Sequence, residues 1–162
     1  MELNPSKCIF GVMSSILLGY IVSARGIEPN RDKVSAITNM KQPTCVKDIQ
    51  KLIGCMAALS RFISRLGEKG LPFFKLLKAS EHFSWSEEVD IAFEQLKLFL
   101  TKPPIMTAPR PDETLLVYIV ATSRVVSIAI VVEHEEAGHV YKVQCPVYFI
   151  SEVLNEPKTR YP

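Results

Sequence analysis

The sequence predicts an α+β fold in which a small β-hairpin is followed by a helical bundle and then by an antiparallel β-meander. Three observations predict this order: a strand-like apolar opening over residues 1–26, a long stretch of helical periodicity from Thr44 to Leu66, and a β-rich composition from Leu115 onward. With 162 residues and 48% hydrophobic content, the chain can bury a substantial core.

The opening hairpin is predicted to have strands at Ile9–Met13 and Leu17–Ser23 around Ser14-Ser15, closed by Gly26. Two strands alone are marginally stable in water. We therefore expect the chain to begin inside a larger domain, with Met1 not its natural start.

Three helices are predicted next, and we expect them to pack as one bundle over 30–39, 44–66 and 71–79. Asn30 is expected to cap the first helix, over Arg31–Thr38, and Pro43 to end that segment. In the second, Ile49, Leu52, Ile53, Met56, Ile63 and Leu66 share one side at about 100° per residue. Gly67–Gly70 is predicted to form a turn, with Pro72 in the first turn of the third helix.

The opposite side of the second helix is basic at both ends and nearly smooth in the middle. It carries Lys47, Lys51, Gly54, Ala58, Arg61 and Arg65, with Gln50 at its edge. An exposed glycine inside a helix costs about 1 kcal/mol relative to alanine, which favours a close approach of another molecule to the backbone at Gly54 and Ala58. A nucleic-acid duplex fits this pattern, because phosphates attract the cations and a groove admits only small side chains. An ordinary amphipathic helix with a solvated charged face fits these residues as well.

The charge distribution favours a nucleic-acid partner for the first half of the chain. Residues 1–78 contain 12 Lys and Arg against 5 Asp and Glu, whereas residues 79–162 contain 7 against 12. No run of 18 apolar residues and no signal-peptide layout occurs, so we expect no membrane partner and an intracellular location, cytoplasmic or nuclear. The four cysteines form no CxxC pair and are predicted to be reduced and mostly to pack in the protein.

The second half is predicted to begin with a helix over Glu87–Thr101 whose inner face is Val89, Phe93, Leu96 and Leu100, with Trp85 as a packing anchor. Prolines force 105–112 into an extended connector. The meander strands are predicted at Leu115–Thr122, Val125–Glu133 and Val140–Cys145 running on to Ile150, with a tight turn over 136–139. The apolar run Leu115–Ala121 indicates a strand buried on both faces.

Several short motifs resemble the polymerase polyprotein of Gypsy-type (Ty3-like) long-terminal-repeat retrotransposons, where a reverse transcriptase joins its ribonuclease H-like domain. They are Leu3-Asn4-Pro5-Ser6-Lys7-Cys8, Leu18-Gly19-Tyr20-Ile21-Val22-Ser23 with Gly26-Ile27, Asp48-Ile49-Gln50-Lys51-Leu52-Ile53-Gly54, Arg61-Phe62-Ile63, Pro72, Leu76-Leu77 and Phe83-Ser84-Trp85. The resemblance implies a palm end with a primer-grip hairpin over 1–28, a thumb bundle over 29–80, a helix and connector over 81–112, and the start of a ribonuclease H-like domain over 113–162.

The resemblance also implies roles for single residues. Leu18, Gly19 and Tyr20 would form the turn that holds the primer strand. Gln50, Gly54 and Ala58 would face the minor groove of an RNA/DNA or DNA duplex, and Lys47, Lys51, Arg61 and Arg65 would contact phosphates. Four such contacts give a log–log salt slope of about −3 to −4. The other domains of the polyprotein would be further partners.

We expect no catalysis by this chain alone, although full-length relatives would use magnesium. The sequence has no Asp-Asp pair for a polymerase site, and Val120 stands where the resemblance places the first nuclease aspartate. Glu133, Glu135 and Glu136, with His134 and His139, are either substitute metal ligands or the solvated tip of a hairpin. His82 has no partner in sequence. Three hypotheses result: a duplex-binding piece of a polymerase, a residual metal-dependent hybrid nuclease, and a β-domain that serves as a structural spacer.

Overall fold

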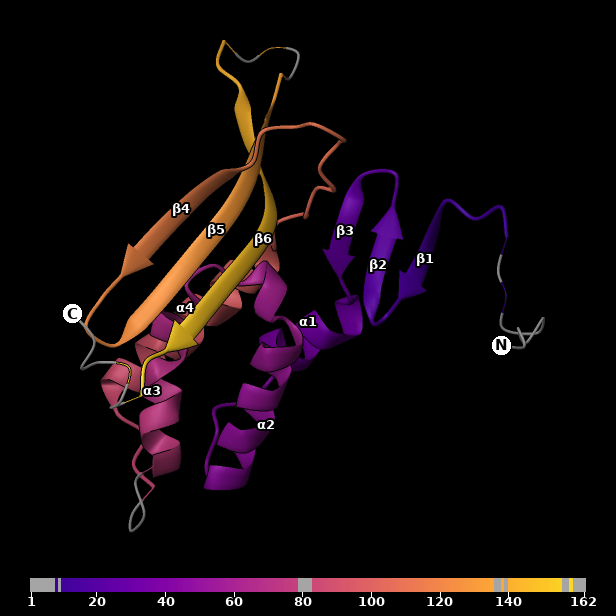
Figure 1. The fold of residues 1–162 in the computed structure, drawn as a ribbon. Coiled ribbons are helices and arrows are strands. Elements are labelled where there is room, and N and C mark those ends of the chain that lie inside the picture. The colour runs from indigo at the N-terminus through magenta and orange to yellow at the C-terminus, as the bar shows by residue number, and fades with distance from the viewer. Residues whose placement is uncertain are drawn as a thin grey trace, which may run out of the picture.

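The computed structural model describes residues 8, 10–78, 83–135, 138, 140–155 and 158, and over these it confirms the α+β fold class. Two three-stranded antiparallel sheets flank a group of helices. Figure 1 shows the second sheet lying across the helices, with the small first sheet beside it. In chain order the elements are β1 (Ser14–Leu17), β2 (Tyr20–Ser23), β3 (Gly26–Pro29), α1 (Arg31–Thr38), α2 (Val46–Ala58), the short 3₁₀ helix η2 (Ser60–Phe62), α3 (Leu66–Lys78), α4 (Glu87–Thr101), β4 (Leu116–Ala121), β5 (Val125–His134) and β6 (Val143–Val153).

The first sheet has one more strand than the predicted hairpin, and its first turn lies elsewhere. The predicted turn at Ser14-Ser15 is wrong: these residues begin β1, and the chain turns at Leu18 and Gly19. Both turn residues have positive φ, 51° and 83°, as a two-residue turn between twisted strands requires. Ile9 lies outside the described residues.

Helix α1 begins and ends as predicted. The Asn30 side chain accepts a hydrogen bond from the Asp32 amide at 2.8 Å, which satisfies one of the unpaired donors of the first turn. Ile37 is fully buried and Val34 packs against the same core, so these side chains anchor the short helix.

The predicted continuous helix over 44–66 is wrong, because it is broken into α2, η2 and the start of α3. Helix α2 ends at Ala58, and Arg65 takes a positive φ of 55°. Leu59, Phe62 and Ile63, which lie at and beyond this break, are all fully buried.

Helix α3 contains the two glycines that predicted a turn, so that expectation is also wrong. A Cβ on Gly67 would lie 2.7 Å from Val125 Cγ1 and 2.8 Å from Ser151 Oγ. Gly67 therefore permits close contact between α3 and the second sheet, and its amide donates to Ser151 Oγ at 2.9 Å. Pro72 lies inside the helix and not in its first turn.

Helix α4 matches its predicted bounds, and its predicted inner face is buried. It packs with α1, α2 and α3 around one hydrophobic core, whose buried residues are Ile37, Ile49, Leu52, Met56, Leu59, Ile63, Phe73, Leu76, Val89, Phe93, Leu96 and Leu100. Trp85 packs edge-on against Phe93 with ring centroids 5.6 Å apart, and its indole N–H donates to Asp90 at 2.9 Å. The packing role predicted for Trp85 is confirmed.

The proline-rich connector joins the two sheets. Ile27 of β3 and Met106 exchange two backbone hydrogen bonds of 2.8 Å, and the Thr107 amide donates to the Pro146 carbonyl at 2.7 Å. Gly26 is required beside this bridge, because a Cβ there would lie 2.4 Å from the Met106 oxygen. The connector is thus extended at its start, as predicted, but the prediction is wrong at its end, where residues 111–112 form a turn with Asp112 at a positive φ of 61°.

The meander has the predicted order β4-β5-β6, with two differences. The third strand begins at Val143 and not at Val140, since Val143 pairs with His134, the last residue of β5. The predicted burial of Leu115–Ala121 on both faces is wrong for this chain, where Ile119 is 66% exposed. Helix α3 and η2 pack against β5 and β6, which leaves the edge strand β4 uncovered. Most of the predicted turn over 136–139 lies outside the described residues.

Candidate nucleic-acid interface

One side of α2 is exposed and carries the cationic, small-residue pattern found in the sequence. Lys47, Gln50, Lys51 and Gly54 are all exposed, while Ile49, Leu52 and Met56 are buried on the opposite side. Among the described residues, neither lysine ammonium takes part in a hydrogen bond or an ion pair. A Cβ added at Gly54 would meet nothing within 4 Å beyond the backbone of α2 itself and the two chain neighbours, so the backbone here is open to approach.

The first turn of α2 is held by Asp48. Its carboxylate accepts from the Thr44 amide at 3.0 Å and from the Thr44 hydroxyl at 3.2 Å. The backbone hydrogen bond from Thr44 is the main cause of a lowered pKa of Asp48, so the carboxyl stays ionised and favours the positive end of the helix dipole. Asp48 thus stabilises the end of the helix that presents Lys47 and Lys51.

A cation missed by the sequence analysis lies beside this end. Lys41 and Lys51 both line a pocket of about 480 Å³ between α1 and α2, and Lys41 is exposed. Its position in the short polar loop before Pro43 was the available signal, since loops between helices often present binding residues.

The other predicted contacts do not continue the same face, because α2 ends at Ala58, which is half-buried. The Arg61 guanidinium lies 5.5 Å from the ring centroid of Tyr20 and 5.1 Å from that of Tyr148. Arg65 pairs with Glu68, whose hydrogen bond raises the pKa of Arg65. Both arginines are exposed, yet each already has partners within the chain.

The residues of the predicted primer-grip turn are at the tip of the β1–β2 hairpin. Leu18 is 87% exposed, and Tyr20 is half-buried with its ring 5.6 Å from that of Phe62. The Lys33 ammonium lies 5.9 Å from the Tyr20 ring, which adds a second cation that the sequence analysis missed. The tip therefore offers an apolar side chain, an aromatic ring and a positive charge.

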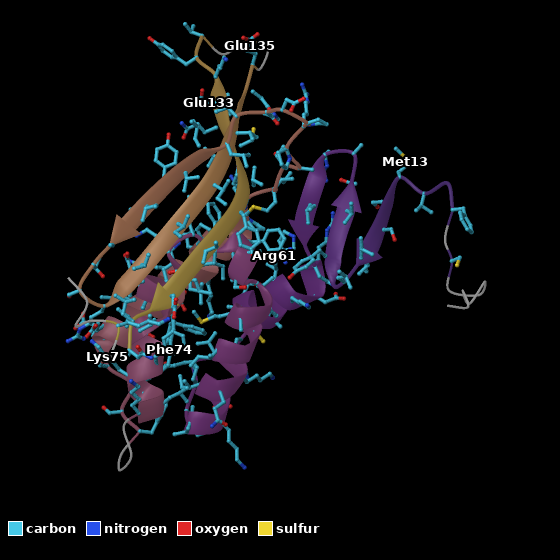
Figure 2. All side chains as sticks on the ribbon, viewed as in Figure 1. Met13, Arg61, Phe74, Lys75, Glu133 and Glu135 are labelled. Atoms are coloured by element: carbon cyan, nitrogen blue, oxygen red, sulfur yellow. The ribbon has the colours of Figure 1, made fainter. Side chains whose placement is uncertain are left out.

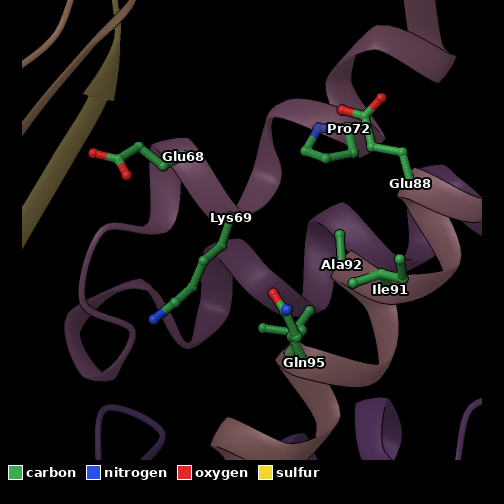
Figure 3. Close-up of a pocket in the computed structure, with 8 residues that line it drawn as sticks. Glu68, Lys69, Pro72, Glu88, Ile91, Ala92 and Gln95 are labelled. Atoms are coloured by element: carbon green, nitrogen blue, oxygen red, sulfur yellow. The ribbon is translucent and has the colours of Figure 1, made fainter.

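A second hollow, between α3 and α4, lacks such a cationic surface. Figure 3 shows its lining, with Lys69 and Pro72 on α3 and with Ala92 and Gln95 on α4, and its volume is about 360 Å³. The Lys69 ammonium donates to the Ser64 carbonyl at 2.7 Å, and burial lowers its pKa. This lysine serves internal packing.

The carboxylates of the second sheet do not converge. Glu133 accepts from Gln144, and Glu113 pairs with His134 at 2.9 Å. Figure 2 places Glu133 and Glu135 at the far tip of the sheet, away from Arg61. Within the part of the chain that the structure describes, no three His, Cys, Asp or Glu residues gather as a metal site, while His82, Glu136 and His139 lie outside it.

The position expected for a nuclease aspartate offers no metal ligand of the required kind. Val120 is 47% exposed and pairs with Ser127 of β5. Magnesium prefers carboxylate oxygens, so these side chains do not fit a catalytic magnesium ion.

Two further observations correct or complete the sequence analysis. Cys45 is exposed at the N-terminus of α2, so the expectation of a packing role is wrong for this cysteine. None of the described helices combines the length and the apolar character needed to cross a bilayer.

Comparison with known proteins gives relatives of one kind. The chain is 29% identical over 162 residues to the retrovirus-related Pol polyprotein from transposon 297 of Drosophila melanogaster, covering 99% of this chain and 14% of that protein. It is 27% identical over 104 residues to the transposon Tf2-3 polyprotein of Schizosaccharomyces pombe, covering 64% of this chain and 8% of that protein. No family model matches the sequence.

Solved structures show the same fold. The foamy viral protease-reverse transcriptase in complex with an RNA/DNA hybrid superposes with a TM-score of 0.71 at 18% identity, over 93% of this chain and 20% of that one. Its complex with double-stranded DNA gives 0.70 at 17% identity, over 93% and 30%. The resemblance to retrotransposon polymerase polyproteins is thereby confirmed, and the chain spans a small share of the relatives it matches.

Proposed function

We propose that this chain, a relative of retrotransposon polyproteins, binds RNA/DNA and DNA duplexes without sequence preference through the exposed side of α2. The observation that carries the proposal is the combination of two lysines, Lys47 and Lys51, that have no partner among the described residues, with an open backbone at Gly54. Cations without internal partners are available to phosphates, and their binding releases counterions. Gln50 and Ala58 are proposed to border the groove.

Two further observations support this proposal. The first half of the chain, which contains α2, carries the excess of positive charge, and such a charge attracts a polyanion over long range. The foamy viral enzymes that share the fold were solved with an RNA/DNA hybrid and with double-stranded DNA. Phosphate contacts of this kind carry no sequence information, which is why we propose binding without sequence preference.

Fluorescence anisotropy with a labelled RNA/DNA hybrid tests the proposal. We expect Lys47→Ala/Lys51→Ala to weaken binding clearly. The matched control is Lys75→Ala/Lys78→Ala, which removes the same charge from two exposed positions on α3. Figure 2 labels Lys75. If both double variants weakened binding equally, the loss of net charge alone would explain the effect. That result would contradict a site on α2.

We also propose that this chain carries out neither polymerisation nor hybrid hydrolysis by itself. Two-metal chemistry needs carboxylates that hold both ions, and Val120 replaces the one expected on β4. A magnesium-dependent cleavage assay on an RNA/DNA hybrid tests this proposal. Sustained turnover that Glu133→Gln abolishes would establish the nuclease alternative.

The meander also supports a second proposal, that it positions neighbouring polyprotein domains. Its uncovered face presents a row in which Ile119, Ile128 and Ile150 lie directly opposite one another across three strands, and contiguous apolar surface of this kind favours a protein contact. Mixing the chain with the separately produced remainder of the polyprotein tests it: Ile119→Lys should reduce the association and leave hybrid binding unchanged. Association that is insensitive to Ile119→Lys would contradict the spacer role.

A further inference from the structure

Arg61 stands at the place where the small sheet, η2 and β6 meet. Figure 2 shows it between the small sheet and β6. Its guanidinium lies over the rings of Tyr20 on β2 and Tyr148 on β6, 5.5 Å and 5.1 Å from their centroids. The neighbouring Phe62 is fully buried, and its ring lies 5.6 Å from that of Tyr20.

The surroundings of this guanidinium favour stacking over ion pairing. Among the described residues, no carboxylate lies within ion-pair distance of Arg61. A planar, weakly hydrated guanidinium stacks well on aromatic rings, and a cation within about 6 Å of a tyrosine centroid is attracted by the ring. Both ring distances meet that condition.

The Arg61 contact adds a side-chain link between the small sheet and the second sheet. The backbone of the small sheet is tied to the rest of the molecule by the Ile27–Met106 bridge and by the short connection from β3 to α1, where Tyr20, the residue after the Leu18–Gly19 turn, pairs with Pro29. Tyr20 directly follows this turn, so a side chain that holds Tyr20 also orients the turn relative to α2.

We infer that Arg61 is a positioning residue, which fixes the Leu18–Tyr20 turn relative to α2 and β6 by stacking between Tyr20 and Tyr148. The inference rests on the proposed duplex binding and deepens it: the turn and α2 form one preorganised surface for the duplex. Arg61 contributes through orientation, and it makes no phosphate contact of its own.

Salt dependence separates orientation from phosphate contact. A phosphate contact contributes about 0.9 to the log–log salt slope on a duplex, whereas a change in orientation lowers affinity at every salt concentration alike. We expect Tyr148→Leu to weaken hybrid binding about two- to fivefold, the worth of one exposed cation–π pair, with an unchanged slope. Tyr148→Phe keeps the ring and should bind like the wild type.

Arg61→Lys provides the decisive comparison, since it keeps the charge and loses the planar group. Binding weakened by Arg61→Lys at an unchanged slope supports positioning. A wild-type affinity for Arg61→Lys or Tyr148→Leu, or a slope that Arg61→Gln reduces by about 0.9, would overturn the inference. Circular dichroism checks that each variant is folded. If Tyr148→Leu is unfolded, the Arg61→Lys result alone tests the inference.

The proposed function can fail separately from this inference. If Lys47→Ala/Lys51→Ala binds the hybrid like the wild type, the α2 site is wrong whatever the tyrosine variants do. If the wild type binds no hybrid at all, thermal unfolding still tests the stack. The double variant Arg61→Gln/Tyr148→Leu should then lower the melting temperature by less than the sum of the decreases caused by the two single substitutions. Strictly additive decreases would contradict the contact.

Discussion

Replacing Gly54 should separate the stability of α2 from its proposed use. Apart from the backbone of α2 itself and the two chain neighbours, no atom lies within 4 Å of a Cβ at this position, and the glycine is exposed, so Gly54→Ala meets no steric opposition. The gain in helix propensity is about 1 kcal/mol, which corresponds to a rise in melting temperature of about 2–4 °C for a chain of this size. Leucine has a similar propensity, so Gly54→Leu should also stabilise the free protein.

Duplex binding should respond in the opposite direction. If a groove approaches the backbone at Gly54, a leucine side chain overpacks that contact, and overpacking costs about 1–3 kcal/mol, or fivefold or more in affinity. Thermal unfolding and anisotropy with an RNA/DNA hybrid measure the two effects on the same samples. Gly67→Ala is the control for the stability assay, because its Cβ would lie 2.7 Å from Val125 and should destabilise by about 1–3 kcal/mol. Unchanged hybrid affinity in Gly54→Leu would refute a close approach at this glycine.

Two further predictions concern the framework of the site. Asp48→Asn should destabilise the protein at neutral pH: the folded-state pKa of Asp48 is lowered, so its contribution is present above the ordinary value of 3.8 and is lost as the pH falls through the lowered pKa. Thermal unfolding from pH 7 to pH 2 should therefore show the variant and wild type converging at the acidic end. Phe93→Ala should lower the free energy of unfolding by about 3–5 kcal/mol, because Phe93 is 1% exposed in the core, and denaturant unfolding followed by Trp85 fluorescence measures it.

Local signals predicted the helices whose ends are set by their own residues. Asn30 caps α1 with its own side chain, and α4 has an acidic first turn and a proline stop, so both sets of bounds could be read from the sequence. Gly67 shows the opposite case. The local sequence around this glycine predicts a turn, yet the contact that requires a glycine comes from Ser151, 84 residues away in the chain.

The candidate site could likewise be predicted only where the local sequence pattern defines it. The exposed side of α2 follows from its 3.6-residue period, which holds from Lys47 to Gly54. The period fails at Arg61, because α2 ends at Ala58 and the Arg61 guanidinium lies over the ring of Tyr148 on β6. Contacts between residues this distant in sequence leave no periodic signal.

The salt dependence of hybrid binding tests the central claim most directly. If Lys47 and Lys51 each meet a phosphate, their joint replacement by alanine should reduce the log–log slope by about 1.8, so that wild-type affinity falls about twelvefold more than the variant's between 50 and 200 mM salt. The Lys75→Ala/Lys78→Ala control should retain the wild-type slope. Parallel salt plots for the wild type and the Lys47→Ala/Lys51→Ala variant would contradict phosphate binding by α2.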